Sequence, residues 1–205
     1  MLDVVARQGM VLMGCGKMGG AMLSGWLKGG LPPASVWVTD PNPADWLTGA
    51  GVHINEDYPD APSVALIAVK PQMMGDALPA VAALGGGATL VISVAAGTPI
   101  SRFEEVFGPG TPVIRAMPNT PAAISQGITA IIGNSHASAE HLDLAESLLD
   151  AVGQVVRLDN EGQIDAVTGV SGSGPAYVFH MIECLAAAGE EQGLGTDLAM
   201  QLAMA

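Results

Sequence analysis

The sequence predicts an α/β fold in which a doubly wound sheet, with helices on both faces, is followed by a short all-helical segment. From Gly9 onward, short apolar runs of the buried-strand kind alternate with helical stretches. Such alternation favours a parallel sheet covered by helices. After about residue 162 the sequence is predicted to be helical almost throughout, apart from one glycine-serine loop.

The predicted strands are short and apolar, as expected for strands that are buried on both faces. They span residues 10–13, 36–39, 64–69, 89–94, 112–117, 127–133 and 154–158, with a shorter strand expected near Val52. Between them lie the predicted helices or helical turns, at residues 17–30, 43–51, 73–84, 99–108 and 138–151.

The composition argues against one class of partner. The 205 residues are 49% hydrophobic and carry a net charge of −13, with only 7 basic side chains. We expect no nucleic-acid partner, because phosphate backbones are bound by surplus Lys and Arg. A phosphate-bearing cofactor remains compatible with this charge, since backbone N–H groups and a helix dipole can hold it.

Cysteines and apolar runs bear on the compartment. Cys15 and Cys184 lie far apart, without the spacing of metal ligands. We therefore expect reduced thiols, a cytoplasmic location and no metal site. The N-terminal residues contain no apolar signal core, and no apolar run approaches the roughly 20 residues of a membrane helix. Membrane association is accordingly not expected.

A glycine-rich turn follows the first predicted strand and opens a helix. Gly14, Gly16 and Gly19 have G-x-G-x-x-G spacing. The first glycine permits the tight turn, the second lets a pyrophosphate approach the backbone, and the third lets the helix pack closely on the strand. In this context we expect dinucleotide binding, with a purely structural glycine turn as the alternative.

Asp40 ends the second predicted strand, at the distance where dinucleotide-binding folds place an acidic residue for the adenosine ribose. Its carboxylate would accept a hydrogen bond from a ribose 2′-OH and repel a 2′-phosphate, which favours NAD over NADP. The alternative is that Asp40 only initiates a turn with Pro41.

Lys70 follows the strand at residues 64–69, on the rim where open α/β sheets bind their ligands. The alternative is a solvated surface lysine. Small residues at positions 93–97 end the next strand and would let a nicotinamide ring pass close to the backbone.

The run from Ser171 to Pro175 precedes an apolar helical stretch. A helix start leaves N–H groups without intrahelical partners, which is a site for an anion. The alternative is an ordinary helix cap, with proline in the first turn.

Five segments, taken in order, resemble the pyrroline-5-carboxylate reductases: GCGKMGGAM, AVKPQ, SVAAG, RAMPNTPA and VTGVSGSGPAYVF. The likeness runs from about Gly9 to the end of the chain. It implies NAD(P)H-dependent reduction of 1-pyrroline-5-carboxylate to L-proline, the last step of proline biosynthesis, by hydride transfer to the C=N carbon. It also implies a Rossmann-like N-terminal domain, a helical dimerisation domain, and a homodimer or higher homo-oligomer.

The resemblance further implies site residues, while the catalytic residues stay unassigned. The cofactor, NADP or NAD, would contact Gly14, Cys15, Gly16, Lys17, Met18, Gly19, Asn55, Ala68, Val69, Lys70, Pro71, Val94, Ala95 and Ala96, in addition to Asp40. The substrate would contact Met117, Asn119, Glu161, Val170, Ser171, Ser173 and Gly174, with its carboxylate held at the serine run. Of the 4 histidines, only His180 lies on the predicted substrate-side helix.

We expect a dinucleotide-binding domain at residues 1–162 and the start of a helical substrate and dimerisation domain at residues 163–205. This second domain is expected to be incomplete. The chain stops in mid-pattern, with Thr196 or Asp197 as the cap of a last helix, and the SPGGTT-like segment of the family does not occur before Ala205. Either a partner chain covers the exposed apolar face or a C-terminal portion is missing.

Three alternatives remain open at this stage. The preference between NADH and NADPH is unsettled, because Asp40 favours NADH whereas many family members favour NADPH. A different Rossmann-fold dehydrogenase, acting on a hydroxy acid or another imine, would want a lysine or histidine on the first helix of the second domain, and the helix at residues 174–193 has no lysine. A non-catalytic dinucleotide-binding protein is the third alternative.

Overall fold

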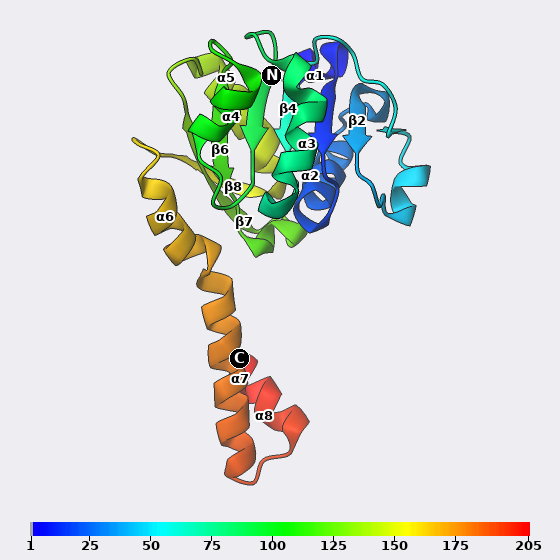
Figure 1. Ribbon diagram of the computed structural model, residues 1–205. Helices are drawn as coiled ribbons and strands as arrows, with labels where there is room; N and C mark the ends of the chain where they lie inside the picture. The colour runs from blue at the N-terminus through cyan, green and yellow to red at the C-terminus, as the bar shows by residue number, and fades with distance from the viewer. Residues whose placement is uncertain (1) are drawn as a thin grey trace.

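Eight strands form a single sheet in the computed structural model, which describes residues 2–205 (Figure 1). The strand order is β3-β2-β1-β4-β5-β6-β7-β8. The strands are β1 (Met10–Met13), β2 (Val36–Thr39), β3 (His53–Ile54), β4 (Val64–Ile67), β5 (Leu90–Ser93), β6 (Val113–Met117), β7 (Gly127–Gly133) and β8 (Gly153–Arg157). Each lies within or close to a predicted apolar run.

All neighbouring strands pair in parallel except β6 and β7, which are antiparallel. The prediction of a parallel sheet is therefore wrong at this one pairing. A parallel crossover needs a connection of about a dozen residues or more, whereas residues 118–126 form only a tight link that contains the short helix η5 (Thr120–Ile124).

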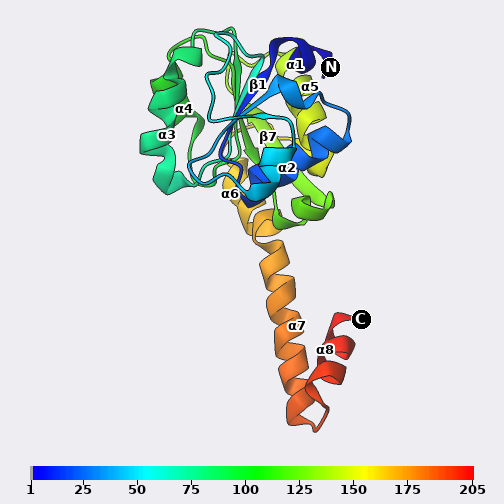
Figure 2. The same cartoon turned by 90° about the vertical axis from the view of Figure 1, so that its right-hand side faces the viewer.

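Helices cover both faces of the sheet, as Figure 2 shows. One face carries α1 (Asp3–Gln8), α2 (Lys17–Lys28) and α5 (Ala139–Leu149), and the other carries α3 (Met74–Val81) and α4 (Ile100–Phe107). Short helical turns complete the domain: η1 (Pro33–Ser35), η2 (Asp45–Gly49), η3 (Pro71–Met73), η4 (Ala82–Leu84) and η6 (Asp150–Val152). The prediction missed α1, which buries Val5 in the core.

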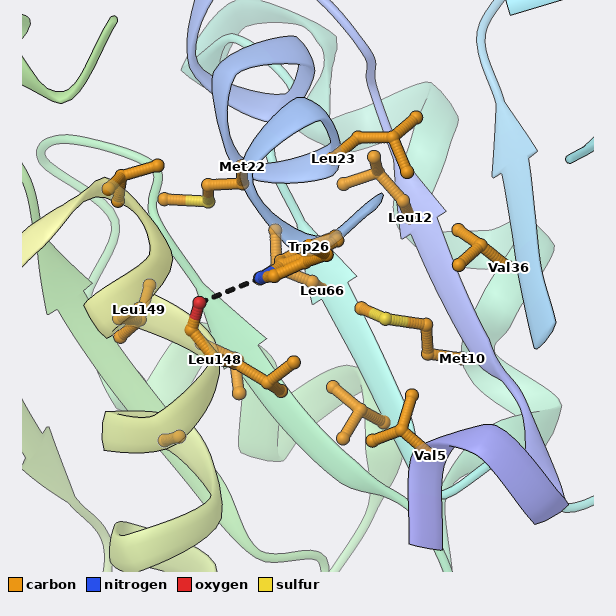
Figure 3. Packing of buried hydrophobic residues seen from close by; sticks show 14 of the residues in the cluster. Val5, Met10, Leu12, Met22, Leu23, Trp26, Val36, Leu66, Leu148 and Leu149 are labelled. Carbon is orange, nitrogen blue, oxygen red and sulfur yellow. Dashed lines mark hydrogen bonds between the residues drawn. The ribbon is translucent and has the colours of Figure 1, made fainter. Parts of the chain in front are cut away.

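The core on the α2 side centres on Trp26 (Figure 3). Its side chain is only 1% exposed, and its indole N–H donates to the Leu148 carbonyl of α5 at 2.7 Å. Because a buried indole N–H without a partner would be destabilising, this bond fixes how α2 and α5 meet. The position of α2 matters for function, since its first turn borders the glycine loop.

The C-terminal residues form an arm that stands away from the sheet (Figures 1 and 2). It consists of α6 (Gln163–Val167), the π-helix η7 (Thr168–Gly172), α7 (Gly174–Glu191) and α8 (Thr196–Met204). Buried Ala186 and Ala199 pack α8 against α7. The N-cap of α8 is Gly195, whereas Thr196 or Asp197 was predicted, and Thr196 is already the first residue of the helix. Within residues 2–205, no helix combines the length and the apolar character needed to cross a membrane.

Candidate functional site

The loops after β1, β4 and β5 meet at one edge of the sheet. Met13, Ile67 and Ser93 are register partners across these parallel strands, so the loops that follow them leave from the same edge. They enclose a cavity of about 510 Å³. Its lining comes from three predicted cofactor segments: Gly16, Lys17 and Met18; Ala68, Val69, Lys70 and Pro71; and Val94, Ala95 and Ala96. Sequence segments up to 80 residues apart thus converge at the place where open α/β sheets bind ligands.

The three glycines of the loop have different surroundings. Gly14 has a φ of +86°, and a Cβ there would lie 2.8 Å from the Ala68 carbonyl oxygen. A Cβ on Gly19 would collide with the Gly14 carbonyl oxygen. A Cβ on Gly16, in contrast, would meet no atom within 4 Å. Gly14 and Gly19 are therefore needed by the fold itself, whereas the space in front of Gly16 is open for a ligand.

Asp40 holds the glycine loop from the side of β2. One carboxylate oxygen accepts the Cys15 N–H at 2.7 Å, and the other accepts the Asn42 N–H at 2.8 Å. Asn55, at a φ of +53°, accepts from the Asp40 N–H and donates to the Asp40 carbonyl, both at 2.9 Å. The bond from the Asn42 N–H forms the turn that is expected if Asp40 begins a turn with Pro41. The bond from the Cys15 N–H is a second role of Asp40, which could not be predicted from the spacing of residues in the sequence.

Cys15 lies beneath this loop and is only 6% exposed. Burial, with a smaller contribution from the Asp40 carboxylate, raises the pKa of the Cys15 thiol to about 11. The thiol is therefore neutral at physiological pH. Cys15 therefore carries no negative charge that would repel a phosphate group bound at this loop.

Lys17 and Lys70 supply the positive charge of the cavity. Both side chains are exposed and line it, and within the described residues neither ammonium forms an ion pair. In a chain with 7 basic residues and a net charge of −13, two unpaired ammonium groups at one edge of the sheet favour an anionic ligand there.

The predicted substrate residues begin on the neighbouring strand. Ser93 of β5 pairs with Arg115 of β6, so Met117 leaves the sheet beside the cofactor cavity. A Cβ on Gly172 would lie 3.0 Å from the Met117 Cε, which places the π-helix directly against this methionine. Asn119 donates to the Ser171 carbonyl at 3.2 Å and accepts the Ile128 N–H at 2.9 Å.

Glu161 fastens the arm to the sheet. One of its carboxylate oxygens accepts from the Arg115 guanidinium at 2.7 Å and from the Ile100 N–H, at the start of α4, at 2.8 Å. The Arg115 side chain is only 9% exposed. Sequence reasoning did not assign Arg115, although a charged residue inside a buried strand requires a partner. Glu161 is that partner, 46 residues later.

The run from Ser171 to Pro175 contains the start of α7 at Gly174, but this start is not a free helix end. α6, η7 and α7 follow one another almost without interruption, and the Ser173 N–H donates to the Thr168 carbonyl at 2.8 Å. The Ser173 N–H is therefore not free for an anion, while the anion site at this run stays a prediction. Pro175 does lie in the first turn of α7, as the alternative interpretation required.

Pro175 also accounts for the π-helix. It has no N–H for the Ser171 carbonyl four residues earlier, and its ring crowds that carbonyl. The wider turn relieves the crowding, and Asn119 donates to the freed oxygen. Ser173 is partly exposed, and its hydroxyl has no hydrogen-bond partner among the described residues.

The remaining predicted residues have less defined surroundings. Val170 is 77% exposed and lines an almost wholly apolar cavity of about 410 Å³ between β7, β8 and α6. His180 is exposed on α7, with Glu183 and Cys184 as its nearest polar neighbours, at 3.8 and 3.7 Å. Gly174 begins α7, and its Cβ position is open.

Two family models match the chain. The model described as "Pyrroline-5-carboxylate reductase dimerisation" matches residues 161–205, and the model described as "NADP oxidoreductase coenzyme F420-dependent" matches residues 10–97. The first match contains the whole arm, and the second contains the glycine loop, Asp40 and the segment around Lys70.

Curated relatives are similar over nearly the whole chain. The pyrroline-5-carboxylate reductase of Pseudomonas aeruginosa is 37% identical over 201 residues, which cover 95% of this chain and 74% of the relative. The one of Synechocystis is 46% identical over 152 residues, covering 73% of this chain and 55% of the relative. A solved pyrroline-5-carboxylate reductase from Coxiella burnetii is 31% identical, with a TM-score of 0.86 over 96% of this chain and 76% of that one.

Proposed function

Because the chain belongs to the pyrroline-5-carboxylate reductase family, we propose that it reduces 1-pyrroline-5-carboxylate to L-proline with a nicotinamide dinucleotide. One observation carries the proposal: three predicted cofactor segments line one cavity at the carboxyl edge of the sheet, and Met117 leaves the adjacent strand beside it. Cofactor and imine would thus lie on the same side of the molecule. The proposed place of action is the cytoplasm.

The residues at the edge fit a dinucleotide, either NADP or NAD. The open space before Gly16 admits a pyrophosphate close to the backbone, and Lys17 and Lys70 offset its charge. Small Ala95 and Ala96 leave room for the nicotinamide half. When bound, the reduced nicotinamide supplies the hydride that the C=N carbon receives. The match of residues 10–97 to an NADP oxidoreductase model supports this assignment.

The protein would orient the imine and favour its charged form. An iminium accepts hydride far more readily than a neutral imine, so we expect the ring nitrogen to be protonated at transfer, which removes the need for a dedicated general acid. We propose that the substrate carboxylate binds near the unpartnered hydroxyl of Ser173. The other proposed contacts are Met117, Asn119, Glu161, Val170, Ser171 and Gly174.

We also propose that residues 1–162 bind the dinucleotide and that the helices from residue 163 onward join two copies of the chain. α7 exposes Tyr177, Phe179, Met181 and Leu185 by 59%, 61%, 65% and 55%. Tyr177, Met181 and Leu185 form one stripe at i, i+4 and i+8, and Phe179 lies on another face of the helix. Exposed side chains of this size indicate a protein interface, and the matched dimerisation model covers them. Phe179→Glu is expected to dissociate the assembly in sedimentation, while Glu190→Gln on the same helix leaves the mass unchanged.

The direct test is reduction of pyrroline-5-carboxylate, compared with NADH and with NADPH. Turnover supports the proposal. Cofactor binding without turnover, and without proline-dependent reduction of NAD(P) at alkaline pH, supports a non-catalytic nucleotide-binding protein instead. Ser173→Ala should raise the KM for the imine more than it lowers kcat, because it removes a binding contact. Unchanged kinetics would count against the role of Ser173.

A further inference from the structure

A tryptophan stands beside the glycine loop, on the side away from the nicotinamide cavity. Trp46 belongs to η2, the short helix between β2 and β3, and its side chain is 46% exposed. It lines a second cavity, of about 330 Å³, together with Gly16, Lys17, Gly20 and Ser24. Its indole Cζ2 lies 3.7 Å from the Cβ position of Gly20, so part of the ring packs on α2 while the rest faces the cavity.

The two cavities adjoin at the glycine loop. Gly16 and Lys17 line both of them. One cavity lies toward β4 and β5, among small residues. The other is bounded by η2, which follows β2 on the opposite side of β1 in the sheet order. A dinucleotide has two halves joined by a pyrophosphate, and in this sheet order its adenosine half lies on the β2 side.

Asp40 is not suited to hold the adenine ring itself. Each of its carboxylate oxygens accepts one backbone N–H, from Cys15 and from Asn42, and its remaining lone pairs could accept from ribose hydroxyls, but a carboxylate offers no face on which a base can stack. Lys17, in contrast, is exposed at the junction of the two cavities and has no ion-pair partner within residues 2–205. Trp46 is the only aromatic residue that lines either cavity, as far as the chain is described.

We propose that Trp46 and Lys17 form the recognition site for the adenosine half of the cofactor. The indole offers a flat apolar face to the adenine ring, and the ammonium pairs with the phosphates between the two halves. This inference rests on the proposed function, in that the ligand is a nicotinamide dinucleotide. Stacking does not depend on the ribose 2′ substituent, so Trp46 contributes equally to the binding of NADH and of NADPH.

The test measures the binding of each half of the cofactor separately. ADP and nicotinamide mononucleotide are titrated calorimetrically into the full chain and into Trp46→Ala. Because stacking of a base on an aromatic side chain is worth at least about 1 kcal/mol, ADP should bind Trp46→Ala about fivefold more weakly or worse. Trp46→Phe keeps an aromatic face and should lose less than Trp46→Ala, while mononucleotide binding should be the same in all three proteins.

Tryptophan emission gives a readout that does not depend on activity. ADP should quench the emission of the wild-type protein and should no longer do so in Trp46→Phe. Trp37→Phe is the matched control, because Trp37 stacks on His53 at a centroid distance of 4.4 Å and lines neither cavity. Its variant should retain the quenching.

Equal ADP affinity in the wild type and in Trp46→Ala would overturn the inference. It would also be overturned if Trp46→Ala lost as much affinity for nicotinamide mononucleotide as for ADP, because that would indicate a disturbed glycine loop. If the wild type still reduces the imine in those cases, the proposed function survives and only the role of Trp46 is lost. A wild-type protein that binds neither nucleotide and reduces no imine would overturn both.

Discussion

Around the glycine loop, the backbone itself fixes the geometry, whereas around the arm a few side chains provide the attachment. Gly14 and Gly19 lie so close to neighbouring carbonyl groups that no side chain fits, and Asp40 accepts the Cys15 N–H between them. The arm is attached through Glu161 and Asn119, with Gly172 resting on Met117. The comparison teaches that the geometry of the nucleotide end rests on close backbone contacts within the chain, while the substrate end depends on a small number of polar bonds.

The largest effect is expected from Glu161→Leu. This change leaves the guanidinium of Arg115, whose side chain is only 9% exposed, without its ion-pair partner. Removing one member of a buried pair typically costs about 3–5 kcal/mol, and the partial exposure of Glu161 lowers our expectation to about 2–3 kcal/mol of unfolding free energy. Chemical denaturation measures the loss.

Glu161→Gln is the matched control, since its amide oxygen can still accept from Arg115 and from the Ile100 N–H. It should lose less stability than Glu161→Leu. In Glu161→Leu the KM for the imine should rise, because the arm loses its attachment, and in Glu161→Gln it should rise less; the NADPH affinity of both variants should stay near that of the wild type. An equal loss of NADPH affinity would show that the two regions are not independent.

The next prediction compares two glycines of the same loop, Gly19 and Gly16. Gly19→Ala places a Cβ against the Gly14 carbonyl, and overpacking of this kind costs about 1–3 kcal/mol, so we expect about 2 kcal/mol and a loss of nucleotide binding. Gly16→Ala meets no protein atom within 4 Å, so its stability should be unchanged. Its nucleotide affinity should nevertheless fall, because the added methyl group occupies the space of the pyrophosphate. Unchanged affinity in Gly16→Ala would contradict the proposed place of the cofactor.

A smaller effect is expected at the link between β6 and the π-helix. Asn119→Ala removes the donor to the Ser171 carbonyl and the acceptor of the Ile128 N–H. Leaving such groups without partners costs about 1–2 kcal/mol where water reaches them in part. Asn119→Asp keeps the acceptor and should lose less. Hydrogen exchange at residues 168–173 should accelerate in Asn119→Ala and not at the glycine loop.

The strands were predictable because their information is local. The runs at residues 36–39 and 127–133 coincide with β2 and β7, since a buried strand is visible in its own apolar sequence. The antiparallel direction of β7 was not predictable in this way, because it follows from the length of a link. Helix α1 was also missed, since a short helix gains its stability from the burial of Val5 in a distant core.

In the candidate site, too, the features set by local sequence were predictable and those set by distant partners were not. The glycine loop was predictable from spacing, because one strand and one helix define its geometry. The bond between Asp40 and the Cys15 N–H, 25 residues apart, and the pair of Arg115 with Glu161, 46 residues apart, depend on partners that only the fold brings together. The π-helix escaped prediction because serine and glycine before a proline also suit a helix start, and only the Asn119 bond distinguishes the two.

The smallest effect is expected at Cys15, in the glycine loop, and appears only at high pH. The Cys15 pKa is raised from 9.0 to about 11, chiefly by burial and further by Asp40. Because the folded state resists formation of the thiolate, the free energy of unfolding falls as the pH rises from about 9 to about 11. At pH 10 the loss attributable to Cys15 is about 1 kcal/mol. With Cys184→Ser as the common background, wild-type Cys15 should show this loss relative to Cys15→Ala, and alkylation of Cys15 should accelerate over the same range. Equal pH profiles for the two proteins would mean that the thiol is accessible and the loop less rigid than its backbone contacts imply.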